Sequence, residues 1–224
     1  LRVPHEVDSD SFEGYDAVEL LTERLRQARA GAPLHHEERP DVVRICQLVD
    51  GMPLGIELAA AWAHTLSVAE IAEGIRQSLD FLRAPHGMPD HHLSMRAVFN
   101  SSWAMLTPGE QVAFRRLSVF DVGFLLDAAQ EVTDTTIGSL AALMGKSLLA
   151  RLPSGRYRVH RLLAQFGEEL LREDPAEHAE MHNRHSRYYL GLLARQEPLL
   201  RGADQPTAIE TIEGAIENIR AAWS

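Results

Sequence analysis

The chain has 224 residues, of which 45% are hydrophobic and 24% charged, and its 22 basic and 32 acidic residues give a net charge of −10. This composition excludes a wholly disordered or collagen-like chain, and the net negative charge disfavours a general nucleic-acid binder. The single cysteine, Cys46, excludes an internal disulfide and a zinc site made of several cysteines. No stretch approaches the about 20 apolar residues of a membrane span, so we expect a cytoplasmic protein with no membrane contact.

The amino end lacks the apolar core of a signal peptide and does not begin with Met, which is compatible with a fragment of a longer protein. At about 150 residues per domain, the length predicts two small domains or one domain with appendages.

Four helix starts are marked by an N-cap residue followed three positions later by Glu, the capping-box pattern. The first predicted helix runs to about Ala30 and is ended by Gly31. Two of the four starts also place proline, Pro108 and Pro175, at the first helical position. The four pairs are Asp16 with Glu19, Ser67 with Glu70, Thr107 with Glu110, and Asp174 with Glu177.

An apolar stripe over residues 41–50 predicts a helix closed by Gly51 in the C′ position. The next helix is expected from about Leu54 through Trp62, and because it is apolar on almost all sides we expect it to be buried. Residues 83–92 are predicted to be a loop and the domain boundary.

The second half begins with four predicted helices, near 94–105, 108–118, 124–132 and 136–144. A two-stranded hairpin over 147–160, with its turn at 153–155, and a helix over 162–172 come next. Three helices, a hairpin and a closing helix predict a winged-helix domain. Two further helices, roughly 176–196 and 206–222, resemble the first pair of a helical-repeat array.

The motif Gly145-Lys146-Ser147 resembles the end of a phosphate-binding loop, but the first glycine of that loop would have to be residue 140, which is leucine. Three histidines, His178, His182 and His185, follow helical spacing, and a second group lies in the loop with Asp90. Solvated polar residues are the preferred interpretation of both groups, so no metal ligand and no catalytic residue is assigned. The loop histidines are His86, His91 and His92.

No acidic residue lies between Asp134 and Glu168, which makes the hairpin region cationic. Three interpretations stay open: a nucleic-acid-binding wing, a surface facing an anionic ligand or acidic domain, and a solvated hairpin whose charges block strand pairing. The basic residues concerned are Lys146, Arg151, Arg156, Arg158 and Arg161.

Several segments of the chain resemble segments of the STAND signal-transduction ATPases and follow one another in the same order as in that class. The class includes bacterial LuxR-type and antibiotic-regulatory activators, plant NB-ARC proteins and the apoptosome ATPase. Residues 48–61, LVDGMPLGIELAAA, are similar to the motif GLPLAIELAAA of that class. Residues 15–29 are similar to the helix before that motif, residues 94–120 to its SLRAALDWSY and LSPEEQALFRRLAVF segments, and residues 156–163 to its winged-helix signature.

The resemblance implies a mainly α fold in which a four-helix, ARC1-like subdomain precedes a winged-helix domain and the start of an α-helical repeat array. Residues 1–14 would be the end of the nucleotide-binding domain, 15–90 the helical subdomain, 91–173 the winged helix and 174–224 the first TPR-like sensor helices. The phosphate loop and the magnesium-binding residues would lie upstream of this chain.

The resemblance also implies the site residues. Pro53 would pack on the adenine ring as the proline of the GxP motif, with Gly51 and Leu54 beside it, and His160 would reach the β-phosphate of ADP. Arg161 departs from the pattern, because many relatives carry Asp there, so the role of that acid is not transferred. Without the resemblance, Pro53 simply starts a helix and His160 simply points off a hairpin.

The function so implied is that of a nucleotide-dependent switch segment, with ADP or ATP as cofactor and Mg²⁺ held by the upstream domain. The segment is not expected to be an enzyme on its own, although its parent would be an ATPase. Its partners would be the upstream nucleotide-binding domain, the downstream repeats and a second copy when activated; direct DNA contact is not expected. Two alternatives stay open: a DNA-binding winged-helix regulator using Arg151, Arg156 and Arg158, and a protein-protein adaptor.

Overall fold

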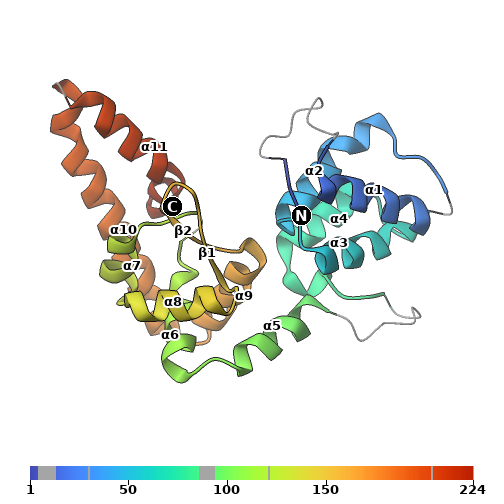
Figure 1. Cartoon of the computed structure of the whole chain (residues 1–224), viewed down its shortest axis with the longest axis horizontal. Coiled ribbons are helices and arrows are strands. Elements are labelled where there is room, and N and C mark those ends of the chain that lie inside the picture. Colours follow the sequence, from blue (N-terminus) through green and yellow to red (C-terminus); the bar gives the residue numbers. More distant parts are fainter. Residues whose placement is uncertain (5–13, 30, 86–93, 121, 203, 224) are drawn as a thin grey trace. The chain divides into compact units, whose positions relative to one another are not determined.

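The computed structural model describes residues 1–4, 14–29, 31–85, 94–120, 122–202 and 204–223. The described chain is mainly α-helical, with eleven α-helices and one two-stranded hairpin (Figure 1). It divides into two compact units, residues 1–104 and 105–224. Residues 94–104, expected with the winged helix, group with the first unit in this division, and the loop residues 86–93 lie outside the described part of the chain.

The first unit is a helical bundle in which α1 packs on α2 and α3, and α2 packs on α4. Its core consists of aliphatic side chains on the inward faces of these helices, such as Leu21, Ile45 and Ile71, all fully buried. Its helices are α1 (Asp16–Ala28), α2 (Arg39–Leu48), α3 (Pro53–Ala60), α4 (Val68–Gln77) and α5 (Met95–Ala104), with 3-10 turns at His36–Glu38, Ala61–His64 and Leu79–Phe81.

Two of the predicted capping boxes, Ser67 with Glu70 and Thr107 with Glu110, are formed as expected. Asp174 also caps its helix, accepting hydrogen bonds from the backbone of the next turn, although Glu177 does not reach back to it. The prediction for Asp16 was wrong: Tyr15 is the N-cap residue, and the Asp16 carboxylate instead pairs with Arg2.

The end of α2 also differs from the prediction. Asp50 (φ 47°) occupies C′, and Gly51 (φ 68°) follows it rather than standing there itself. The Asp50 nitrogen donates to Gln47 O and the Gly51 nitrogen to Cys46 O, which is the double hydrogen bond of a Schellman ending. Two successive left-handed residues therefore turn the chain sharply into α3.

Helix α3 ends at Ala60, and Trp62 lies in the following 3-10 turn, so the expected single helix through Trp62 is in fact two elements. The helix is buried on one side only, because Pro53 and Glu57 are exposed. Glu57 pairs with Arg24 of α1 at 3.2 Å.

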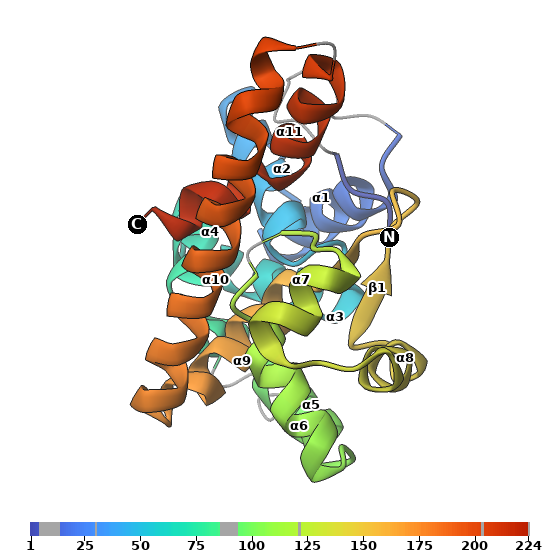
Figure 2. The same ribbon diagram turned by 90° about the vertical axis from the view of Figure 1, so that its left-hand side faces the viewer.

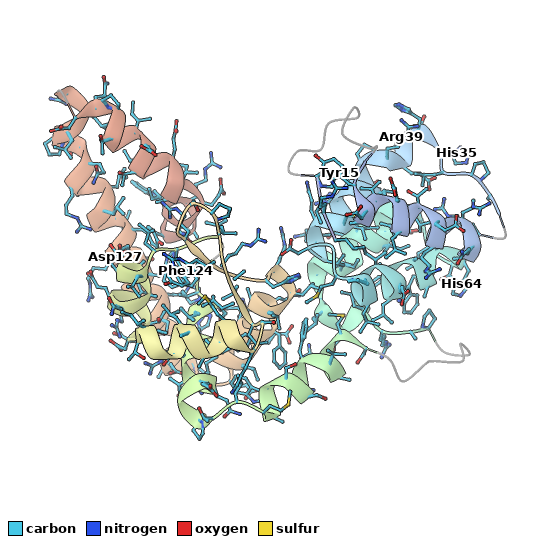
Figure 3. All side chains as sticks on the ribbon, viewed as in Figure 1. Tyr15, His35, Arg39, His64, Phe124 and Asp127 are labelled. Carbon is cyan, nitrogen blue, oxygen red and sulfur yellow. The ribbon has the colours of Figure 1, made fainter. Side chains whose placement is uncertain are left out.

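The second unit follows the predicted order of three helices, a hairpin and a closing helix. In the hairpin, Leu149 pairs with Val159 and Arg151 with Tyr157. Phe124 (Figure 3) adds two backbone hydrogen bonds to Tyr157, of 2.8 and 2.7 Å, on the outer edge. The elements are α6 (Pro108–Leu117), α7 (Leu126–Thr133), α8 (Ile137–Gly145), β1 (Leu149–Arg151), β2 (Tyr157–Val159) and α9 (Arg161–Arg172).

The chain ends in two long helices, α10 (Pro175–Gln196) and α11 (Gln205–Ala222), joined by a 3-10 turn at Glu197–Arg201. They lie side by side, as Figure 2 shows, and this confirms the two predicted helices and the break between them. No helix in the described ranges combines the length and the apolar character that a bilayer span requires.

Candidate functional site

The Gly51-Met52-Pro53-Leu54 segment covers the end of the turn after α2 and the first two residues of α3. Pro53 occupies the first position of α3, where its missing N–H costs no helical hydrogen bond. The Pro53 ring is exposed, and Met52 and Leu54 beside it are half-buried. The turn therefore presents a small apolar corner at the surface, on a backbone whose conformation the Schellman ending fixes.

Residues 1–4 run alongside this turn. The backbone nitrogen of Leu1 donates to Gly51 O at 3.2 Å, and the Gln47 side chain donates to Pro4 O at 2.9 Å. Ala17 of α1 donates to Arg2 O at 3.3 Å. Tyr15, at the start of α1, is labelled in Figure 3. The segment before the helical unit is thus attached to the same end of the bundle as the predicted adenine-contacting residues.

His160 follows β2 directly and is the N-cap residue of α9, with φ −58° and ψ 137°. Its backbone carbonyl accepts the first hydrogen bond of the helix, from Ala164 at 2.8 Å, and its side chain is half-buried. Arg161 is exposed. His160 belongs to the second compact unit and Pro53 to the first, so no single unit brings the two predicted site residues together.

Lys146 and Arg156 of the hairpin region make polar contacts within the chain. The Lys146 ammonium contacts a carboxylate oxygen of Glu110 at 2.7 Å. The Arg156 guanidinium donates to Gly123 O at 3.3 Å and lies against α11, where a Cβ on Gly214 would stand 2.4 Å from Nη2. Arg156 thus serves to join the hairpin to the last helix.

The other three cations of the hairpin region differ in their solvent exposure. The Arg151 guanidinium carbon lies 5.8 Å from the centre of the Tyr157 ring. Arg151 and Arg161 are exposed, whereas Arg158 is half-buried. The contacts of Lys146 and Arg156 therefore leave a smaller cationic surface than five unengaged side chains would make.

The three histidines of α10 separate into two environments. His185 is 2% exposed, with its ring centre 5.5 Å from that of Phe120 and 4.7 Å from that of Tyr189. Burial lowers the pKa of His185 to about 4. The interpretation of all three as solvated polar residues is therefore wrong for His185.

His178 and His182 lie one helical turn apart, with ring centres 4.3 Å from each other, and both contact Glu168 of α9. The sequence interpretation missed Glu168. The signal for it was its position ten residues before His178, on the helix that precedes a short turn.

A second polar group that the sequence did not reveal joins α6 to α10. Each carboxylate oxygen of Glu177 accepts from one arginine, Arg115 Nε at 2.6 Å and Arg116 Nε at 2.8 Å. Burial raises the pKa of Glu177, but the two guanidiniums more than offset this and hold it below its usual range. The group is thus a fixed ionic junction.

An apolar hollow of about 380 Å³ lies between α10 and α11 near the carboxyl end. None of the residues assigned to nucleotide binding lines it. Its lining residues are Leu190, Leu193, Ala194, Glu197, Leu200 and Trp223.

No protein-family model matches the chain. Among curated proteins, the "Putative HTH-type transcriptional regulator Rv0890c" of Mycobacterium tuberculosis is 32% identical over 220 residues, covering 93% of this chain and 25% of the relative. "Uncharacterized protein Rv0894" of the same species is 34% identical over 172 residues, covering 70% of this chain and 43% of the relative. "Regulatory protein AfsR" of Streptomyces griseus is 29% identical over 185 residues, covering 76% of this chain and 18% of the relative.

The chain therefore has distant homology, at about 30% identity, to regulatory proteins over most of its length. It spans about a quarter of the length of the first of these relatives.

Proposed function

We propose that this chain is the switch segment of a STAND-type transcription-regulatory protein, in which the bound nucleotide controls opening and oligomerisation. Two observations on the sequence support the proposal. The motifs of that class occur in order along the sequence, and the relatives with regulatory names match over most of the chain.

In this proposal residues 15–90 form the ARC1-like subdomain, 91–173 the winged helix, and 174–224 the first TPR-like helices. The supporting features are the bundle of α1 to α4, the order of α6 to α9 with the hairpin, and the packed pair α10 and α11. A single helical pair cannot bury its own outer face, which is why a repeat array needs successors.

The observation that carries the nucleotide proposal is the apolar corner of Met52, Pro53 and Leu54, which follows the hydrogen-bonded Schellman ending of α2. An adenine ring presents a flat, weakly hydrated face that an exposed proline ring can cover, so these residues fit the group. Pro53 would make this contact, with Gly51 allowing the close approach of the chain and Leu54 extending the apolar surface.

His160 would supply the second contact, to the phosphates. An imidazole at the N-cap of α9 stands at the positive end of the helix dipole, where anions are favoured. Both ring nitrogens of His160 are shielded from solvent in this structure, so the ring would have to be uncovered before its N–H could donate to a phosphate oxygen. A hydrogen bond to a charged group is worth about 1.5–3 kcal/mol. In this proposal His160 is the residue of the second unit that senses the nucleotide.

Hydrolysis is not part of the role of this segment. The phosphate loop and the Mg²⁺ ligands would belong to an upstream nucleotide-binding domain, with which residues 1–4 would be continuous. Exchange of ADP for ATP would release the contact at His160 and shift the population towards an open state able to self-associate.

The test uses the polypeptide in which this segment follows its nucleotide-binding domain. We expect mass spectrometry of the purified, folded protein to find about one ADP per chain in the wild type. His160→Ala should release most of it, whereas His64→Ala, which removes an exposed histidine of the first unit, should not. Folded wild-type protein without nucleotide would contradict the proposal and favour a protein-protein adaptor.

A further inference from the structure

The side chains of Glu168, His178 and His182 form a cluster that the proposed switch does not use, here called the α9–α10 cluster. Their three donor atoms, one carboxylate oxygen and two imidazole nitrogens, all lie within 4.8 Å of one another. The Glu168 Oε1 atom is 2.8 Å from His178 Nε2 and 3.5 Å from His182 Nε2. We propose that this cluster is a binding site for a divalent transition metal ion, with Zn²⁺ the best match.

The ligand types select the class of metal. Two imidazoles and one carboxylate suit zinc and its transition-metal neighbours, whereas Mg²⁺ and Ca²⁺ prefer sites made of oxygen. Imidazole binds a metal ion through a neutral ring nitrogen, and each of the two histidines can supply one. The site offers three protein ligands and leaves a fourth position for water.

The spacing of the donor atoms fits a tetrahedral ion. Zinc lies about 2.0–2.2 Å from nitrogen and oxygen ligands, so tetrahedral ligands stand roughly 3.3–3.6 Å apart. The distance from Glu168 to His182 already has this value, and the hydrogen bond from Glu168 to His178 would have to open by roughly 0.5–0.8 Å. The third pair, the two imidazole nitrogens, lies within 4.8 Å, and adjustments of the side chains would complete the tetrahedral arrangement.

The two helices hold the ligands in place. His178 and His182 occupy positions i and i+4 of α10 and so lie on one face, one turn apart. Asp174 caps that helix two residues after α9 ends at Arg172, so the connection between the helices is short and hydrogen-bonded. Ligands on two packed helices stay close together, unlike ligands on a loop.

The environment of Glu168 gives an independent reason to expect a ligand. Its side chain is 17% exposed, and its second carboxylate oxygen, Oε2, is shielded from solvent and has no hydrogen-bond partner among the described residues. A buried anionic oxygen without a partner is costly, and an ion held by both carboxylate oxygens of Glu168 would satisfy it. Hydrogen bonds to the two histidines account only for Oε1.

One neighbour opposes the metal. The Nε atom of Arg172 lies 3.1 Å from Glu168 Oε1 and places a positive charge beside the site. The Arg172 side chain is 64% exposed, so it can turn into solvent when a cation binds. Removal of Arg172 should therefore strengthen metal binding. A cluster that served only as a structural hydrogen-bond network would show no such gain in metal affinity.

The experiment is a calorimetric titration of the full chain with Zn²⁺ in excess Mg²⁺, together with thermal unfolding with and without zinc. We expect one saturable site per chain and a higher Tm with zinc. Glu168→Gln and His182→Gln should each weaken binding by at least about tenfold, since even indirect partners of metal ligands cost about 10–100-fold. Arg172→Ala should bind more tightly than the wild type.

His64→Gln is the matched control, because the chain has 11 histidines and His64 is an exposed one outside the cluster. It should bind zinc like the wild type. Circular dichroism shows whether each variant is folded, and the Gln variants retain polar side chains of similar shape. Equal zinc affinity in all variants, or no saturable binding by the folded wild type, would overturn the proposal.

Discussion

The peptide of Leu1 lies directly against Gly51: a Cβ atom on Gly51 would stand only 2.4 Å from the carbonyl oxygen of Leu1. The Leu1 nitrogen in turn donates to the Gly51 carbonyl. This pairing joins the segment before the helical unit to the turn that carries Pro53. The glycine is thus required by the close approach of a second stretch of backbone as well as by its own φ of 68°.

We therefore expect Gly51→Ala to destabilise the first unit by at least about 1–2 kcal/mol, the cost of a left-handed conformation for a residue with a Cβ. The overlap with Leu1 adds to this cost. Denaturant unfolding followed by circular dichroism measures the change.

Gly109→Ala provides the control, because a Cβ there meets nothing within 4 Å and the residue lies in the first turn of α6. Alanine should be neutral or stabilising there by up to about 1 kcal/mol. Equal stability of the Gly51→Ala variant and the wild type would show that the contact with Leu1 does not hold in solution.

A second prediction concerns the ionic junction at Glu177. Glu177→Gln removes the charge that both Arg115 and Arg116 share, and we expect a loss of about 1–3 kcal/mol in the free energy of unfolding. Glu180→Gln, on an exposed position of the same helix, should change stability by less than about 0.5 kcal/mol. Similar losses in the two variants would mean that helix propensity, rather than the junction, is responsible.

A third prediction concerns acid. The pKa of His185 is about 4 in the folded chain, below its ordinary value of about 6.5, because the ring is buried. Between these values the unfolded state takes up a proton that the folded state does not, so stability falls as the pH falls from about 6.5 to about 4. The loss from this one group is on the order of 3 kcal/mol once the pH is below both values.

Urea unfolding at pH 7 and pH 5 tests this. His185→Leu should show a shallower dependence on pH than the wild type, because the buried group no longer titrates. His64→Gln, which changes an exposed histidine, should keep the dependence of the wild type. An unchanged slope in His185→Leu would place the acid sensitivity elsewhere.

Much of the local structure could be predicted because its causes are local. Ser67 and Thr107 cap their helices through atoms three residues away, and the hairpin follows from a change of period around a turn. The same pattern predicts Asp16 as a cap, but this prediction is wrong because the Asp16 carboxylate pairs with Arg2. A capping signal predicts the right residue only where no distant charge competes for it.

The clusters that join helices could not be predicted in this way. Glu177 contacts arginines about 60 residues earlier, and His185 packs against Phe120, in the segment that follows α6. Helical spacing placed the three histidines of α10 on one side, but only the packing of α9 and of Phe120 separates His178 and His182 from His185. Helical spacing predicts which side chains share a face of a helix, whereas the segments packed against that face determine their burial and contacts.

The central claim, that Pro53 contacts the adenine of a bound nucleotide, is tested most directly by ADP affinity in a polypeptide in which the proposed nucleotide-binding domain precedes this chain. Pro53→Ala removes roughly 1 kcal/mol of apolar contact and should weaken ADP roughly fivefold. Pro108→Ala changes the same residue type at the same exposed first position of another helix, and should leave the affinity unchanged. Equal ADP affinity in the two folded variants would contradict the account.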